Sequence, residues 1–185
     1  SLGNGTREAV MQAIRQGQNL INHDGHGWIN ILSVGGWSHR IYNIDFDTIT
    51  NAPRYGILYS IGCWTSAFDF ASIAEAFVNS PNGGGVAFIG NSSYGWGSPG
   101  NPGFGYSDRF DSRFFYSLFR ENNYCLGEAL AMAKAYFIPY SREENIYRWH
   151  QYQINLLGDP ELPIWTRIPD TIVAFSPEYI PRGNT

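Results

Sequence analysis

The stretch Ile57-Leu58-Tyr59-Ser60-Ile61-Gly62-Cys63-Trp64 is an apolar run that ends in a Gly-Cys step. A continuous apolar run of this length is typical of a strand buried inside a parallel sheet. In open α/β sheets the active site lies in the crevice outside the carboxyl ends of the strands. This run therefore places the Cys63 thiol at the carboxyl end of a strand, next to the crevice in which such folds have their active sites.

A second run of the same form lies upstream, where Leu20-Ile21-Asn22-His23 gives way to Asp24-Gly25-His26-Gly27. If the two strands are neighbours, their ends lie ~5 Å apart, and the His26 imidazole comes within reach of the thiol. A thiol and a base are the minimum that nucleophilic catalysis requires. We therefore predict that Cys63 is the nucleophile. His26 is predicted to protonate the leaving amine and then to activate water.

Each of these residues also has a structural interpretation. A lone cysteine is often a small buried core residue, but Gly62 before Cys63 and the polar Thr65-Ser66 step after it favour a thiol near solvent. Cys125 lies in a helical pattern, and we expect it to be buried and inert. His23 lies on the strand itself, where a packed, hydrogen-bonded role is more common than catalysis.

Two further parts of a site follow from the same placement. The backbone N–H groups of Gly27 and Cys63, each at a strand end, are predicted to stabilise the negative charge that develops on the substrate. The segment 91–106 is irregular and rich in Gly, Ser and aromatic residues, which is typical of a pocket wall. The residues predicted to contact substrate there are Ser92, Ser93, Tyr94 and Trp96.

A rival chemistry is zinc binding by His23, Asp24 and His26, since imidazoles and a carboxylate in one loop are zinc ligands. An extended Gly-rich loop offers no rigid scaffold for them, and no further ligand is obvious from the sequence. Nucleophilic catalysis is therefore the preferred interpretation, with no cofactor required for the chemistry.

The composition fits one folded domain. The chain has 185 residues, 43% of them hydrophobic and 15% charged, which is enough for a sizeable core. A net charge of −4 without a Lys/Arg run argues against nucleic acid as a partner, and no stretch is apolar and long enough to span a membrane. Two cysteines make no disulfide framework. Little Lys with abundant Gly, Asn, Ser, Tyr and Trp favours a secreted or cell-surface protein.

The hydrophobic periodicity predicts an α/β fold with a mostly parallel sheet. Helices are predicted at 6–16, 72–78, 108–120, 126–137 and 141–157, the last with a Ser141/Glu144 capping box, and a helical turn at 45–51. Strands are predicted at 19–23, 55–61 and 85–90, with an edge strand at 162–165 and loops at 27–39 and 91–106. The chain begins at Ser1 without Met, so we expect a piece of a longer polypeptide.

These blocks resemble the gingipain-type cysteine peptidases, relatives of caspases and legumains. The resemblance rests on five blocks in order: His23-Asp24-Gly25-His26-Gly27; Ile61-Gly62-Cys63 with Thr65, Phe68 and Asp69; Gly85 to Ser93 running into Tyr94 and Trp96; Leu126-Gly127-Glu128-Ala129; and Leu156 to Pro163. It implies a caspase-like α/β/α sandwich in 1–167, with His26 and Cys63 as the dyad. It also implies protein or peptide substrates, and residues 168–185 as a linker to, or first strand of, an immunoglobulin-like domain.

The chain departs from that family in two ways. Gingipains carry paired cysteines where this chain has Gly62-Cys63. Their acidic residues that orient the histidine and select arginine come from upstream of the histidine, a part that this chain largely lacks, so the upstream part of the same precursor is an expected partner. The resemblance also implies structural calcium, without a ligand that can be assigned here, and suggests basic residues before the cleaved bond.

Two other functions fit the same residues. A processing enzyme of this fold would pass the acyl group to an amine instead of to water. A non-catalytic module would use exposed aromatic residues to hold a peptide or a glycan, and the candidates are Trp28, Trp37, Tyr94 and Trp96.

Overall fold

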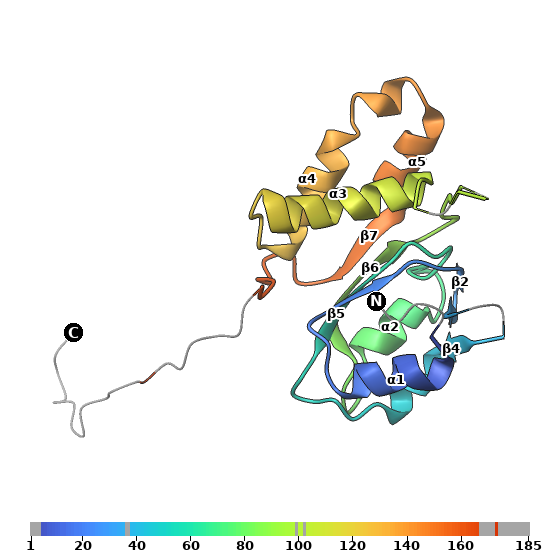
Figure 1. The fold of residues 1–185 in the computed structure, drawn as a ribbon, viewed down its shortest axis with the longest axis vertical. Helices are drawn as coiled ribbons and strands as arrows, with labels where there is room; N and C mark the ends of the chain where they lie inside the picture. Colours follow the sequence, from blue (N-terminus) through green and yellow to red (C-terminus); the bar gives the residue numbers. More distant parts are fainter. Residues whose placement is uncertain (1–4, 36–37, 99, 102, 167–172, 174–185) are drawn as a thin grey trace, which may run out of the picture.

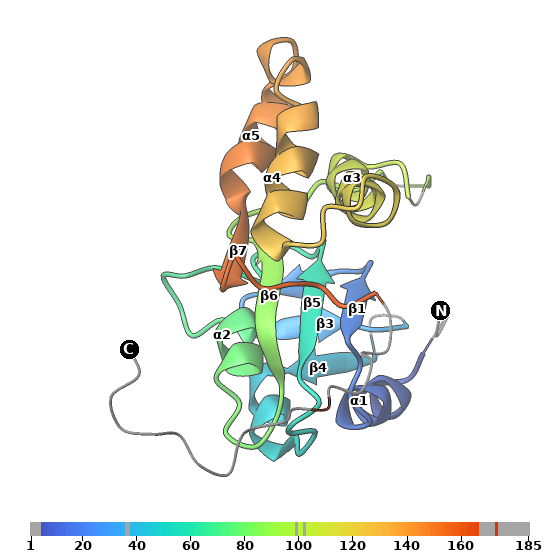
Figure 2. The same cartoon turned by 90° about the vertical axis from the view of Figure 1, so that its left-hand side faces the viewer.

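A four-stranded sheet forms the centre of the molecule. The computed structural model describes residues 5–35, 38–98, 100–101, 103–166 and 173. The strands of this sheet are β1 (Leu20–His23), β5 (Gly56–Ser60), β6 (Gly85–Asn91) and β7 (Ile154–Gly158). They lie in the order β1-β5-β6-β7, with β1, β5 and β6 parallel and β7 antiparallel to β6, as Figure 2 shows. The expected neighbours β1 and β5 are therefore hydrogen-bonded to each other.

Helices cover both faces of this sheet (Figure 1). One face carries α3 (Tyr106–Arg120), α4 (Leu126–Tyr136) and α5 (Asn145–Gln153), and the other carries α1 (Arg7–Arg15) and α2 (Ile73–Val78). Alternate residues of β5 serve the two cores: Ile57 and Tyr59 pack towards α3 and α4, whereas Leu58 packs towards α1 and α2. The predicted α/β/α sandwich with a mostly parallel sheet is thus the observed fold.

The helix starts follow from the capping residues. Thr6 Oγ1 accepts a hydrogen bond from Ala9 N at 3.2 Å, and Gly17, in the left-handed region at φ +81°, follows the end of α1. Ser72 caps α2 in a capping box with Glu75. The predicted turn at 45–51 is a 3₁₀ helix, η1 (Asn43–Thr48). The expected order of strand, helix and strand through β5, α2 and β6 is present.

The segment 27–39, predicted to be a loop, instead begins a small antiparallel sheet. This sheet is formed by β2 (Gly27–Trp28), β3 (Ile31–Ser33) and β4 (Arg40–Tyr42). Leu32 and Ile41 are opposite each other in the register and both join the core on the α1/α2 face. Buried residues on such short strands give too little periodicity to be read from the sequence.

The helix predicted at 141–157 is also corrected. Ser141 lies in a 3₁₀ turn, η2 (Tyr140–Arg142), and its hydroxyl donates to the Phe137 carbonyl at 2.9 Å. Glu144 accepts a hydrogen bond from the Tyr106 hydroxyl, so these two residues form no capping box. After α5 the chain continues as strand β7. Successive side chains of a strand point to opposite faces of the sheet, and Leu156 and Leu157 accordingly pack into opposite cores.

The predicted edge strand at 162–165 is wrong, since the antiparallel edge of the sheet is β7. Only an isolated bridge between Pro163 and Cys125 forms there. Cys125 is half-buried just before α4 rather than enclosed in the core.

The predicted linker or first strand at 168–185 lies outside the described residues, apart from Val173. Of the helices in the described ranges, none has the length and apolar character needed to cross a bilayer.

Candidate active site

Two glycines bring the ends of β1 and β5 into backbone contact. A Cβ atom on Gly62 would lie 2.9 Å from both N and Cα of Gly27, and a Cβ on Gly27 would lie 3.0 Å from the Cys63 carbonyl oxygen. Contacts this short leave no room for a side chain at either position. Because His26 precedes Gly27 and Cys63 follows Gly62, the contact places the imidazole and the thiol on adjoining segments.

A tight turn presents Cys63. Asn91 Nδ2 donates to the carbonyls of Ile61 at 2.8 Å and Gly62 at 3.1 Å, and the Trp64 N–H donates to the Ser93 carbonyl at 2.8 Å. Trp64 adopts φ +59°, a left-handed conformation that costs a non-glycine residue roughly 1–3 kcal/mol. These bonds from β6 and the segment after it hold the strained turn in place.

The Trp64 ring packs beside the site. It contacts the Trp28 ring at a centroid distance of 5.9 Å and the Tyr94 ring, edge to face, at 5.5 Å. Through its contact with the Trp64 ring, Tyr94 therefore packs against the turn that carries Cys63.

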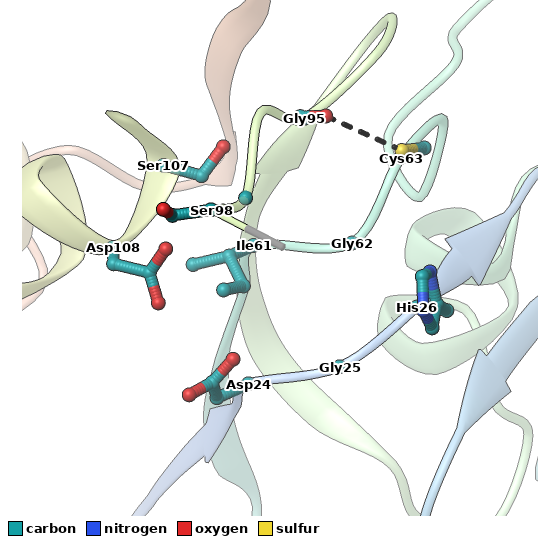
Figure 3. A pocket seen from close by; sticks show the side chains of 11 residues that line it. Asp24, Gly25, His26, Ile61, Gly62, Cys63, Gly95, Ser98, Ser107 and Asp108 are labelled. Carbon is teal, nitrogen blue, oxygen red and sulfur yellow. Dashed lines mark hydrogen bonds between the residues drawn. The ribbon is translucent and has the colours of Figure 1, made fainter. Parts of the chain in front are cut away.

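One pocket joins the thiol and the imidazole. It encloses about 400 Å³, and Cys63 and His26 lie at the same end of it in Figure 3. Its lining residues are Asp24, Gly25, His26, Ile61, Gly62, Cys63, Gly95, Gly97, Ser98, Ser107 and Asp108. Cys63 is half-buried and His26 is exposed. The thiol donates a weak hydrogen bond to the Gly95 carbonyl, with Sγ 3.6 Å from the oxygen.

Carboxylates occupy the opposite end of this pocket. Asp24 and Asp108 lie there beside Ile61, away from the thiol (Figure 3). Asp108, in the first turn of α3, is buried and accepts a hydrogen bond from the Gly103 N–H at 3.1 Å. Burial, and then the charge of Asp108, raise the pKa of Asp24. This end of the pocket therefore suits a cationic group.

Asp111 lies behind these carboxylates, one turn further along α3. Its Oδ2 accepts a hydrogen bond from Asn22 Nδ2 at 3.0 Å, whereas its Oδ1 is buried without a hydrogen-bond partner. Burial raises the pKa of Asp111 to about 7; the Asn22 bond opposes the rise, and the charges of Asp24 and Asp108 add to it. At neutral pH this carboxyl group is therefore partly protonated.

His23 has the packed, hydrogen-bonded role that its place on the strand suggested. The residue is 8% exposed, and its Nε2 lies 2.8 Å from the Ser33 carbonyl, which can only accept, so Nε2 carries the proton. Nδ1 then accepts from the Ser60 hydroxyl at 2.8 Å, and Ser60 Oγ accepts the Gly62 N–H at 3.1 Å. Burial lowers the pKa of His23 and keeps the ring neutral.

Zinc binding by the histidine loop finds no support in this geometry. Both ring nitrogens of His23 are engaged inside the protein. Across the part of the chain that the structure describes, no three His, Cys, Asp or Glu side chains gather as metal ligands would.

Comparison with known protein families identifies the family of this chain. The model of peptidase family C25 matches residues 1–165. The chain belongs to this family. The gingipain-type resemblance of the motifs is thereby confirmed at the level of the family. Among curated protein sequences, none matches the chain.

Solved structures share the fold of this C25 chain. The crystal structure of the Arg-specific cysteine proteinase gingipain R superposes with a TM-score of 0.73 at 19% identity, covering 89% of this chain and 38% of that one. A complex of Porphyromonas gingivalis RgpB pro- and mature domains gives a TM-score of 0.73 at 17% identity, covering 89% of this chain and 38% of that one. A structure described only as a protease gives 0.65 at 17%, covering 92% and 40%. This C25 chain thus spans about two fifths of the length of these structures.

The predicted site residues fall into two groups. Cys63, His26 and Gly27 lie together just beyond the ends of β1 and β5, with Gly27 as the first residue of β2, although their catalytic roles stay predictions. The segment 91–106 supplies one wall of the pocket, but through Gly95, Gly97 and Ser98. The four residues predicted to contact substrate, Ser92, Ser93, Tyr94 and Trp96, are not among the residues that line it.

Sequence reasoning did not identify three of the lining side chains as part of the site. The sequence indicates Asp24 only as a zinc ligand or as part of the histidine motif, and Ser107 and Asp108 lie in the first turn of a helix far along the chain from the thiol. Polar residues at the start of a helix normally indicate capping, so no signal in the sequence separated them from ordinary helix-start residues.

We predict that Gly62→Ala lowers the free energy of unfolding by about 1–3 kcal/mol, because the new methyl group overlaps the Gly27 backbone. Urea unfolding measures the change. Gly97→Ala is the matched control, since nothing lies within 4 Å of a Cβ at that position. Equal effects of the two substitutions would contradict the close contact.

We predict that Asp111→Asn stabilises the protein at pH 8 but not at pH 4. The folded-state pKa of about 7 lies above the ordinary value of 3.8, so the carboxyl group costs stability as pH rises from 4 to 7, and an amide removes that cost. The gain should be on the order of 2 kcal/mol at pH 8. Urea unfolding at both pH values measures it, with exposed Asp47→Asn as control. A gain independent of pH would be inconsistent with the raised pKa.

Proposed function

We propose that this chain carries the nucleophile and the base of a cysteine endopeptidase. The observation that supports the proposal most strongly is the single pocket in which Cys63 and His26 lie at one end, beside the Gly27–Gly62 contact. Membership of a cysteine peptidase family supports it independently. The chain covers 38% of gingipain R, and the upstream part of the same precursor remains an expected partner of this site.

In the proposed mechanism the thiol leaves the Gly95 carbonyl by rotation about its Cα–Cβ bond and transfers its proton to His26. The resulting thiolate attacks the substrate carbonyl carbon, and the carbonyl π electrons move to its oxygen. The backbone N–H groups of Gly27 and Cys63 are proposed to stabilise that oxyanion. When the tetrahedral intermediate collapses, the C–N bond breaks and His26 gives its proton to the departing amine.

The second half of the reaction releases the acyl group. His26 takes a proton from water, and the hydroxide attacks the thioester. The C–S bond breaks to give a carboxylic acid, and the departing thiolate takes the proton back from His26 to restore the free thiol. The half-buried position of Cys63 and the exposure of His26 suit this sequence of steps, because the nucleophile is sheltered while water reaches the base.

A preference for a basic residue before the cleaved bond is part of the proposal. Asp24 and Asp108 supply negative charge at the end away from the thiol, and a Lys or Arg side chain extending past Ile61 would meet both carboxylates. His26 also lines a second hollow, of about 300 Å³, together with Gly27, Trp28, Ile31, Ser33 and Arg40. This hollow is suited to the residue after the cleaved bond, whose amine His26 protonates.

The wider setting is also part of the proposal. A secreted or cell-surface location agrees with the composition and with the fold shared with gingipain R. Structural calcium and a following immunoglobulin-like domain are further expectations from the family. Protein or peptide substrates follow from the family's activity.

We predict that Cys63→Ala in the full-length protein lowers the cleavage of a peptide library by at least ~10³-fold, as loss of a covalent nucleophile does. Cys125→Ala is the matched control, because that thiol is half-buried at the start of α4 and distant in sequence from the pocket segments. Unchanged cleavage by Cys63→Ala would contradict the proposal.

The alternative, a processing enzyme that passes the acyl group to an amine, is tested by adding an amine that competes with water. Formation of the amide product would reveal acyl transfer.

We predict that Asp24→Asn raises KM for peptides with Lys or Arg before the cleaved bond by roughly 10-fold, the loss of one charge-assisted hydrogen bond. Peptides with a neutral residue there should keep their KM. Asp47→Asn, an exposed acid on η1, should change neither. A uniform rise in KM for both substrate classes would refute charge selection by Asp24.

A further inference from the structure

A buried histidine outside the proposed dyad is linked to the pocket by Ser107. His150, on α5, is fully buried and stacks on the Phe110 ring at a centroid distance of 5.3 Å. Its Nδ1 lies 2.8 Å from the Ile146 carbonyl and its Nε2 lies 2.9 Å from Ser107 Oγ. A carbonyl only accepts, so Nδ1 carries the proton and Nε2 is an acceptor. The Ser107 hydroxyl therefore donates to His150.

Ser107 in turn holds the pocket wall. Its Oγ accepts the Trp96 N–H at 2.9 Å, and its own N–H donates to the Trp96 carbonyl at 3.0 Å. These two bonds fix Trp96 against the first turn of α3. The orientation of the peptide group between Gly95 and Trp96 is thereby set.

That same peptide group reaches the thiol. Its N–H belongs to Trp96, and its carbonyl is the Gly95 oxygen that accepts the Cys63 thiol at 3.6 Å. A continuous chain of hydrogen bonds therefore runs from Cys63 through the Gly95–Trp96 peptide to Ser107 and His150, and it ends on the Ile146 carbonyl. Once Nδ1 of His150 carries the proton, every hydrogen bond in this series can run in only one direction.

The packing around Gly95 makes this link rigid. A Cβ at Gly95 would lie 2.4 Å from the Ile61 carbonyl oxygen and 2.8 Å from Asn91 Nδ2. The Gly95 backbone thus rests directly on the end of β5, next to the cysteine turn. A small rotation of the Gly95–Trp96 peptide would therefore move the acceptor that orients the thiol.

We propose that Ser107 and His150 are positioning residues for the nucleophile: they orient the Gly95–Trp96 peptide, whose carbonyl holds the Cys63 thiol in the pocket before substrate binds. The proposal rests on the proposed function for its effect on catalysis. Neither residue touches the reacting atoms. Burial lowers the pKa of His150 to about 4, which agrees with a neutral ring that accepts from Ser107 at neutral pH.

The direct test is the S–H stretching band of Cys63 in the infrared spectrum, because hydrogen bonding moves this band to lower frequency. Subtracting the spectrum of full-length Cys63→Ala isolates the band. We expect Ser107→Ala to shift it towards the frequency of a free thiol. Ser117→Ala should leave it in place, since Ser117 is a buried serine of the same helix that bonds to Asn123, away from the pocket.

Two substitutions of His150 separate the hydrogen bond from packing. In His150→Gln the side-chain oxygen can still accept from Ser107, so the S–H band should stay near its wild-type position. His150→Phe keeps a ring stacked on Phe110 but removes the acceptor, and should shift the band as Ser107→Ala does. In a peptide assay, Ser107→Ala and His150→Phe should lower kcat roughly 10-fold with little change in KM for basic substrates.

The proposal is overturned if the S–H band stays at its wild-type position in both Ser107→Ala and His150→Phe, or if Ser117→Ala shifts it equally. If Ser107→Ala or His150→Phe does not fold, the band of the other variant is sufficient for the test. This readout does not depend on peptidase activity. Unchanged cleavage by Cys63→Ala would contradict the proposed function. The S–H stretching band of Cys63 would still test the chain of hydrogen bonds on its own.

Discussion

The contact between the backbones of Gly27 and Gly62 is the constraint on which the rest of the site depends. Parallel pairing brings β1 and β5 side by side, but only two residues without side chains allow the segments beyond the strands to stay in contact. This contact puts the exposed His26 and the half-buried Cys63 on the rim of one pocket. The strained turn at Trp64, held by Asn91 and Ser93, then directs the thiol inward.

Two buried serine–histidine pairs lie on either side of the cysteine turn. His23 bonds Ser60, which caps the Gly62 N–H from the strand side, while His150 bonds Ser107, which holds the pocket wall. Burial lowers the pKa of both rings, so both stay neutral and act as fixed hydrogen-bonding groups. His26 differs from them in being exposed, as a base that exchanges protons with water has to be.

Much of the fold could be predicted from the sequence because β5 and β6 are mostly apolar runs, with Gly62 shortly after β5 and Gly90 near the end of β6, and because α1 and α2 carry their caps. The errors came where tertiary contacts outweighed local patterns: Leu32 and Ile41 build a sheet too short to show a period, and Glu144 bonds Tyr106 instead of capping a helix. For the site, Cys63 and His26 line one pocket beyond the paired strands β1 and β5, while their catalytic roles stay predictions. Ser107 and Asp108 were missed because only the packing of α3 brings them to the pocket, and His150 was missed because only the packing of α5 brings it to Ser107.

Labelling of the full-length protein with a peptidyl chloromethyl ketone that carries lysine next to the reactive group, followed by mass spectrometry of its peptides, tests the proposed site most directly. We predict a single covalent adduct on Cys63, none on Cys125, and a strongly reduced yield when His26 is replaced by alanine. An adduct that favours Cys125, or a folded protein whose Cys63 stays unlabelled while it still binds peptide, would contradict the proposed site.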